Sequence, residues 1–322
     1  MQSLNQAEAD RLSKMDIAIE ARELGKDFGS IQAVKAVSFT VNRGEIFGFF
    51  GPNGAGKTTT IRLLCGLIKP SRGYASVCGH NILADPTGVR RHLTMTLEEN
   101  AFYEKMKVAA YLKFFAAMSG QTSRSQHEKI REVVNVCELS ESLNKRIAVL
   151  SHGQRQKVSL ARAFLSDVPI MFLDEPFQGI DIVHRRILRD YLREYVKKGN
   201  TVFFTSHNLI EAEQIVDRFA FIDRGTVLKI GTARELRDQY LAPMYTIRVS
   251  DPAKAQQVLS DSLPVNECTS KGEEVVVVLK NKEDALRISS LLSTAGVAIL
   301  EMQTVGTMEE VFLRIRQKTE AD

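Results

Sequence analysis

The stretch GPNGAGKTT, from Gly51 to Thr59, decides the fold of this sequence. It matches the pattern GxxxxGK[ST], follows the apolar run EIFGFF and precedes the amphipathic segment TTIRLLCGLI. A backbone that curls at glycines can turn successive N–H groups toward a polyphosphate at a helix N-terminus, where the helix dipole also favours anions. A plain glycine-rich turn is the alternative, but the strand before it and the helix after it favour a phosphate-binding loop.

Within this loop the residue types have separate predicted roles. Lys57 would neutralise the β- and γ-phosphates, and the Thr58 hydroxyl would ligate Mg²⁺. The curl of the backbone is assigned to Gly51, Gly54 and Gly56. The residues predicted to bind the nucleotide here are Gly51, Pro52, Asn53, Gly54, Ala55, Gly56, Lys57, Thr58 and Thr59.

Short apolar runs that end in polar residues recur along the chain: EIFGFFGP from Glu45, VPIMFLDEP from Val168 and NTVFFTSHN from Asn200. Such runs are typical of parallel strands that are covered on both faces. Helical patterns separate them, among them RRILRDYLREYVKKG, which stops at Gly199. The sequence therefore predicts an α/β fold of βαβ units.

Changes of pattern predict the domain boundaries. Residues 1–16 form a polar extension, 17–240 a nucleotide-binding domain and 244–322 a small α+β domain, with RDQYLAP as a linker. Between about 86 and 165 strand signals give way to helical ones, which predicts a helical subdomain. In the last domain MYTIRVS, EEVVVVLK and VAILEMQTV are strand-like, in a βαβαβ order, and the closing TMEEVFLRI has capping-box spacing.

Composition excludes several classes of function. The net charge is only +4, from 43 basic and 39 acidic residues, so no nucleic-acid partner is expected. The four cysteines lie far apart and predict reduced thiols in the cytosol, without a zinc site. No apolar run approaches the ~18–20 residues of a membrane helix, and the N-terminus lacks a secretory h-region, so the chain is not expected to cross a membrane.

Two further strand ends carry candidate catalytic groups. Asp174 directly follows the run IMFL and suits a Mg²⁺ shell, while Glu175 could orient and deprotonate an attacking water. His207 ends FFTSH, where it could contact a γ-phosphate and that water, although a histidine at a loop surface is the simpler interpretation of this residue alone. Because ligands bind at the carboxyl ends of such strands, all three are expected near the phosphate loop.

Taken together, these motifs resemble the nucleotide-binding subunits of ATP-binding-cassette (ABC) transporters, over roughly residues 17–239. LSHGQRQ occupies the place of that family's LSGGQ signature, whose positions here are Ser151, His152, Gly153 and Gln154. By resemblance, Phe28 stacks on adenine and Asp181 lies in the loop that crosses the dimer interface. The resemblance implies a P-loop NTPase of the ABC type, in which a parallel-sheet core carries a helical subdomain and an N-terminal antiparallel β part.

The same resemblance implies ATP and Mg²⁺ as cofactors and a head-to-tail ATPase dimer, formed by two copies or with a second ATPase. ATP binding would close this dimer on the cytoplasmic face of the membrane and drive separate permease subunits. TMEEVFLRI resembles the ending of ATPase subunits from bacterial multidrug and antibiotic exporters. The alternative is a soluble ABC ATPase that acts on ribosomes or DNA.

Two positions depart from the family pattern. Glu98 stands where a glutamine often contacts Mg²⁺ and the membrane subunit; it could ligate Mg²⁺ or be a solvated loop charge. His152 replaces the first signature glycine, and either points away from the nucleotide or donates to a phosphate oxygen. Gly153 is expected to permit an unusual backbone torsion there. Val158, Ala161 and Leu165 are expected to form the buried stripe of the following helix.

Overall fold

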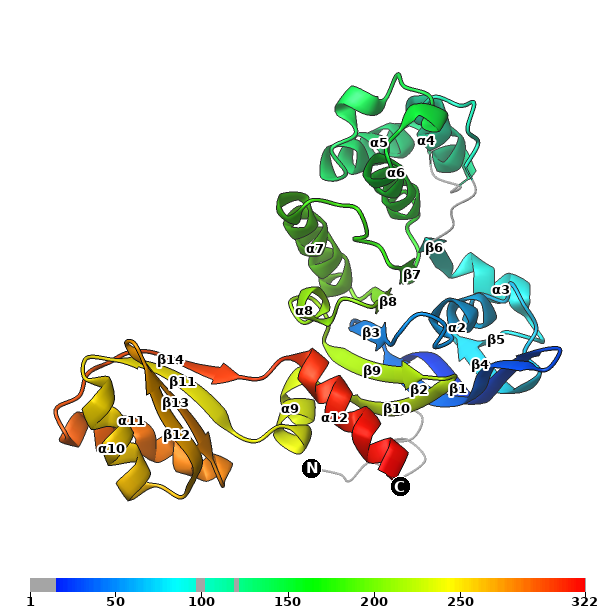
Figure 1. Ribbon diagram of the computed structural model, residues 1–322. Helices are drawn as coiled ribbons and strands as arrows, with labels where there is room; N and C mark the ends of the chain where they lie inside the picture. The colour runs from blue at the N-terminus through cyan, green and yellow to red at the C-terminus, as the bar shows by residue number, and fades with distance from the viewer. Residues whose placement is uncertain (1–15, 97–101, 119–121, 322) are drawn as a thin grey trace, which may run out of the picture. The chain divides into compact units, whose positions relative to one another are not determined.

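The computed structural model describes residues 16–96, 102–118 and 122–321, and its chain forms two compact units, residues 1–230 and 231–322 (Figure 1). Each unit has its own hydrophobic core. The boundary falls earlier than the sequence predicts, because residues 233–240 form a helix of the second unit and are not a linker. Among the described residues, no helix is both long enough and apolar enough to span a bilayer.

A six-stranded sheet forms the centre of the first unit, in the order β10-β9-β3-β8-β7-β6. Its strands are β3 (Ile46–Phe50), β6 (Leu93–Thr96), β7 (Ile170–Asp174), β8 (Thr201–Ser206), β9 (Arg218–Asp223) and β10 (Thr226–Gly231). The pairs from β9 to β6 are parallel, so the α/β prediction is confirmed and the three predicted apolar runs are its central strands. Strand β6 was not predicted from sequence.

The first unit also contains an antiparallel sheet of order β2-β1-β4-β5. Its strands are β1 (Ile17–Phe28), β2 (Ile31–Asn42), β4 (Arg72–Val77) and β5 (His80–Asn81). Aromatic rings join the two sheets: Phe203 of β8 lies 6.0 Å from Phe39 of β2, 5.5 Å from Phe49 and 5.3 Å from Phe172, measured between ring centroids. This buried aromatic cluster packs the antiparallel sheet against the core sheet.

Helices complete the first unit. They are α2 (Lys57–Leu64), α3 (Pro86–Arg91), α4 (Val108–Met118), α5 (Ser123–Val136), α6 (His152–Phe164), α7 (Ile182–Lys197) and α8 (Leu209–Ala212), with 3-10 turns η1 (Ser140–Ser142) and η2 (Ile147–Val149). Helices α4, α5 and α6 pack together (Figure 1). Val158 and Ala161 are buried on α6 and Leu165 is buried at its C-cap, as the periodicity predicts.

The second unit is a four-stranded antiparallel sheet with two helices packed on it and two more beside each other. Its elements are α9 (Ala233–Tyr240), β11 (Met244–Val249), α10 (Pro252–Ser262), β12 (Val265–Lys271), β13 (Glu274–Leu279), η3 (Lys282–Asp284), α11 (Ala285–Thr294), β14 (Ile299–Val305) and α12 (Met308–Ala321). The order β12-β13-β11-β14 makes it a split βαβ arrangement. Strand β12 was missed in the sequence. The capping box of Thr307 and Glu310 at α12 is confirmed.

Candidate functional site

The phosphate loop connects β3 to α2, as predicted. Gly54 and Gly56 have φ of 77° and 104°, in the region that side chains disfavour, so these two glycines make the curl. Gly51 is required for another reason: a Cβ at that position would lie 2.1 Å from the carbonyl oxygen of Ile222. No side chain caps the N-terminus of α2, so its first N–H groups are open to an anionic ligand.

The hairpin of β9 and β10, near the end of the first unit in sequence, supports this loop. Arg224 and Gly225 form the turn between β9 and β10, with φ of 46° and 78°. The Gly225 N–H donates to the Ala55 carbonyl at 3.0 Å, and the Gly225 carbonyl accepts from the Lys35 N–H at 2.8 Å. The loop is therefore held between β2 and the β9–β10 turn.

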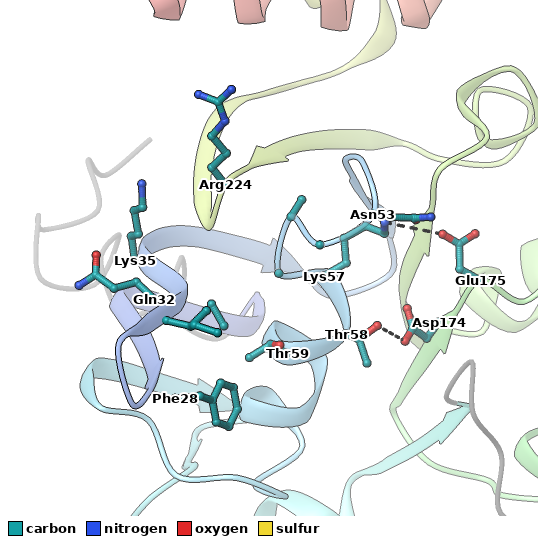
Figure 2. Close-up of a pocket in the computed structure, with 15 residues that line it drawn as sticks. Phe28, Gln32, Lys35, Asn53, Lys57, Thr58, Thr59, Asp174, Glu175 and Arg224 are labelled. Carbon is teal, nitrogen blue, oxygen red and sulfur yellow. Dashed lines mark hydrogen bonds and ion pairs between the residues drawn. The ribbon is translucent and has the colours of Figure 1, made fainter.

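Lys57 lies in the floor of the loop with its ammonium group turned inward. Its Nζ donates to the carbonyl oxygens of Gly51 at 2.9 Å and Pro52 at 3.3 Å, and lies 3.8 Å from Glu175 Oε1. The residue is 7% exposed. The cation is thus already oriented across the loop before any phosphate binds (Figure 2).

Thr58 and Asp174 lie together, as the sequence predicts for a Mg²⁺ site. The Thr58 hydroxyl donates to Asp174 Oδ2 at 2.7 Å, and the Thr205 hydroxyl donates to Oδ1 at 2.5 Å. Asp174 is fully buried, and no cation is paired with it in the described part of the chain. A buried carboxylate beside a hydroxyl is a set of oxygen ligands that suits Mg²⁺. Glu98, the third predicted ligand, lies outside the described residues.

Glu175 is fixed in a backbone conformation that costs energy. Its φ is 46°, and its N–H is bonded to the carbonyl and the hydroxyl of Thr205. The side chain accepts a hydrogen bond from Ser206 Oγ at 3.1 Å, and its Oε1 lies 3.0 Å from His207 Nδ1. Strained positions of this kind persist where the surroundings enforce them, often at functional sites. The structure therefore brings the two predicted catalytic residues into contact.

Lys57, Thr58, Asp174 and Glu175 line a pocket of about 640 Å³, whereas His207 is not among the described residues that line it. Figure 2 shows Phe28 at one end of it and Arg224 at the other, with Lys57 and Thr58 between them. Phe28 is 50% exposed, and Lys26 Nζ lies 5.0 Å from its ring centroid. Sequence reasoning missed the pocket residues Ile31, Gln32, Ala33, Lys35 and Arg224, because no motif marks them and only strand pairing brings them here.

The signature residues lie at the start of α6 and do not line this pocket. Ser151 and Gln154 form a capping box: the Gln154 N–H donates to Ser151 Oγ at 3.3 Å, and the Ser151 N–H donates to Gln154 Oε1 at 3.1 Å. His152 is exposed at the first helical position, with its Cδ2 edge toward Gly179.

The prediction of an unusual torsion at Gly153 is wrong, because Gly153 is an ordinary helical residue without a positive φ. It is needed for close approach instead: a Cβ there would lie 2.3 Å from the Gly179 carbonyl oxygen. This contact seats the first turn of α6 on the loop that follows Glu175.

Substituting Gly153 with alanine should push these two segments apart. We expect the free energy of unfolding to fall by about 1–3 kcal/mol, because the Gly179 carbonyl belongs to the backbone and cannot move aside for the new methyl group as a flexible side chain could. Thermal or urea unfolding measures the loss. Gly231→Ala is the matched control, since the nearest atoms to its Cβ would be side-chain atoms of Leu236 at 3.1 Å and Glu235 at 3.4 Å, and not a backbone oxygen. Equal stability of the two variants would contradict this close contact.

Asp181 caps the N-terminus of α7. Its Oδ1 accepts the His184 N–H at 2.9 Å, and Lys157 Nζ of α6 lies 3.8 Å from its Oδ2. The His184 N–H, and then the Lys157 charge, hold the pKa of Asp181 below its ordinary value. The residue predicted for the dimer interface is therefore also an ionised helix cap within its own chain.

Comparisons with known proteins agree with this geometry. A family profile described as "ABC transporter" matches residues 34–178, and one described as "ATP-binding protein DrrA1-3-like, C-terminal domain" matches residues 231–315. The chain is 37% identical to the probable multidrug ABC transporter ATP-binding protein YbhF of Escherichia coli K12, over 70% of this chain and 39% of that protein. It thus spans about two fifths of YbhF.

A second relative is covered over most of its length. The chain is 33% identical to the daunorubicin/doxorubicin resistance ATP-binding protein DrrA of Streptomyces peucetius, over 77% of this chain and 76% of that protein. A solved structure of an ATP-binding subunit of an ABC transporter superposes with a TM-score of 0.65 and 30% identity, over 69% of this chain and 93% of the other. The chain therefore belongs to the ATP-binding proteins of ABC transporters, and its first unit is an ABC ATPase cassette.

Proposed function

We propose that this chain binds ATP with Mg²⁺, hydrolyses it and thereby powers an exporter whose membrane-spanning part is a separate permease subunit. The observation that carries the proposal is the convergence of Lys57 and Thr58, from the start of α2, with Asp174 and Glu175, from the end of β7, at one pocket. The names of the relatives, multidrug and drug-resistance transport proteins, support export. No reported relative is named as a ribosome- or DNA-acting factor.

The proposed chemistry assigns one task to each side chain. Phe28 stacks on adenine, while the loop N–H groups and Lys57 bind the phosphates. Thr58 and Asp174 hold Mg²⁺, with Glu98 as a further ligand to test; when bound, the ion neutralises charge that develops on the phosphate oxygens.

Glu175 accepts the proton of the attacking water, since the other carboxylate of the pocket, Asp174, is hydrogen-bonded to the hydroxyls of Thr58 and Thr205. His207, bonded to Glu175 Oε1, fixes the orientation of that carboxylate and contacts the γ-phosphate. Ser206 holds the other carboxylate oxygen. The base is thus restrained at both oxygens before water arrives.

We further propose that the site is completed in trans. Ser151, His152, Gly153 and Gln154 are absent from the walls of their own pocket among the described residues, yet the α6 N-terminus beside them is suited to an anion. In a head-to-tail dimer these residues would face the partner's ATP, and Asp181 would lie at the interface. Closing such a dimer encloses each phosphate chain between a loop and a signature.

The permease contact is proposed at a groove of about 290 Å³ between the core and the helical segment. Among the residues that line it are Leu67, Met95, Phe115 and Met118, and Leu67 and Met118 are 43% and 68% exposed. Exposed apolar side chains in a groove are typical of a protein interface. This contact would place the chain on the cytoplasmic face of the membrane.

Membrane association tests this assignment. With its permease coexpressed, we expect the tagged chain to sediment with membranes, and Met118→Glu to move most of it to the supernatant because a charge would be buried in the groove. Leu286→Glu is the matched control, since Leu286 is 85% exposed in the second unit. Sedimentation of the wild-type chain with ribosomes, and not with membranes, would overturn the transport proposal.

A further inference from the structure

Three residues of the signature helix α6 contact the segment 175–181. Gly153 lies against the carbonyl of Gly179, and Lys157 Nζ lies 3.8 Å from Asp181. Between them, Gln156 Nε2 donates to the carbonyl oxygens of Glu175 at 3.2 Å and Pro176 at 3.0 Å. The helix that carries the signature is therefore hydrogen-bonded to the backbone of the residue proposed as the base.

Gln156 is built into this position. It is 6% exposed, and its amide nitrogen makes both bonds where water has little access. A leucine of similar size would leave the two carbonyl oxygens without these donors, and buried acceptors are rarely left unbonded. Nothing in the sequence pattern distinguishes Gln156 from its neighbours in LSHGQRQ, so the contact is visible only in the structure.

The two peptide groups of Glu175 are held by two different elements. Strand β8 fixes its N–H through Thr205, and α6 fixes its carbonyl through Gln156. Because Glu175 has a left-handed φ of 46°, its backbone has a strong tendency to relax, and each of these bonds opposes that relaxation. Releasing the carbonyl would let the peptide rotate and carry the carboxylate away from His207.

We propose that Gln156 is a positioning residue. It sets the orientation of the Glu175 carboxylate and makes that orientation depend on the position of α6. This inference rests on the proposed function, in which Glu175 is the base and the first turn of α6 faces the partner's ATP. If α6 shifts when its first turn binds the partner's nucleotide, the Gln156 side chain would transmit this shift to Glu175 of its own chain and change the position of the base. The link spans about one helical turn, from Gly153 to Gln156.

The test is Gln156→Leu in the full-length chain. We expect kcat for ATP hydrolysis to fall about ten- to hundredfold, the effect of misplacing a reacting group by about an ångström, while KM and the ATP dissociation constant stay within about twofold. Lys57, Thr58 and Phe28 are untouched, so binding should persist. Ser159→Ala is the matched control: Ser159 is buried on the same helix, and its hydroxyl has no hydrogen-bond partner among the residues that the structure describes.

A second variant separates positioning from loss of folding. In Gln156→Glu the buried carboxyl should have a raised pKa and, once protonated, can donate one hydrogen bond to the carbonyls. The ratio of variant to wild-type kcat should therefore rise as pH falls from about 8 to about 6. A general defect in packing would not follow pH in this direction.

The outcomes distinguish the two proposals. Wild-type kcat in Gln156→Leu, or losses of kcat and ATP affinity in equal proportion, would overturn the positioning role and leave the ATPase assignment intact. If instead Glu175→Gln hydrolysed ATP at the wild-type rate, Glu175 would not be the base, and the positioning role of Gln156 would fall with it. Both results come from the same purified chain and the same phosphate-release measurement.

Discussion

Glu175→Gln should bind ATP as tightly as the wild-type chain and hydrolyse it about 10²–10⁴ times more slowly. Glutamine keeps the shape of the side chain and can still bond to Ser206, but it cannot accept the proton of water. Because the variant keeps Lys57 and Thr58, the residues proposed to bind the phosphates and Mg²⁺, affinity should survive. Slow turnover with intact binding should accumulate an ATP-bound dimer.

Single-turnover hydrolysis and size-exclusion chromatography with ATP and Mg²⁺ measure both effects. Glu211→Gln is the matched control: Glu211 is half-buried on α8 and paired with Arg185, but it does not line the pocket among the described residues. We expect this control to turn over within about twofold of wild type. Comparable hydrolysis by Glu175→Gln would remove Glu175 from the role of base.

Lys57→Ala should act on binding itself. The ammonium group is buried among loop carbonyls and aimed across the pocket, so its removal deletes a charge-assisted contact to phosphate at no gain elsewhere. Such contacts contribute about 1.5–3 kcal/mol, which corresponds to ~10- to 100-fold in Kd. Equilibrium binding of a fluorescent ATP analogue measures this change directly.

The control for Lys57→Ala is Lys69→Ala. Lys69 is an exposed lysine shortly after α2, and it does not line the pocket in the described part of the chain. The overall charge changes equally in both variants, so a difference between them isolates the position of the cation. An ATP affinity of Lys57→Ala equal to that of Lys69→Ala would count against the phosphate-loop assignment.

Continuous apolar runs made the central strands predictable. β3, β7 and β8 are buried along their length, and a strand covered on both faces favours apolar residues through most of its run, with polar side chains only near its ends. β6 and β12 escaped this reasoning for a physical reason. LTMT is short and half polar, while VNECTSK is mostly exposed; each is a strand only because a neighbouring strand pairs with it.

The residues of the site also fall into a group that the sequence predicts and a group that it does not. Lys57, Thr58, Asp174 and Glu175 follow from local motifs, because each motif places one chemical group at one end of one strand. The pocket walls at Lys35 and Arg224 depend on pairing between distant strands, which local sequence does not encode. Gln156 is similar: its role depends on where the loop after Glu175 passes over α6.

The turn at Gly225 has a consequence for how the protein is made. It supports Ala55 of the phosphate loop, yet it is synthesised long after that loop and after Asp174 and Glu175. A nascent chain that ended just before β9 would carry every predicted motif of the nucleotide site, His207 included, and lack the turn at Gly225 that supports the phosphate loop. Nucleotide affinity should therefore appear late in translation, so that ATP stabilises finished cassettes and leaves truncated ones exposed to proteolysis.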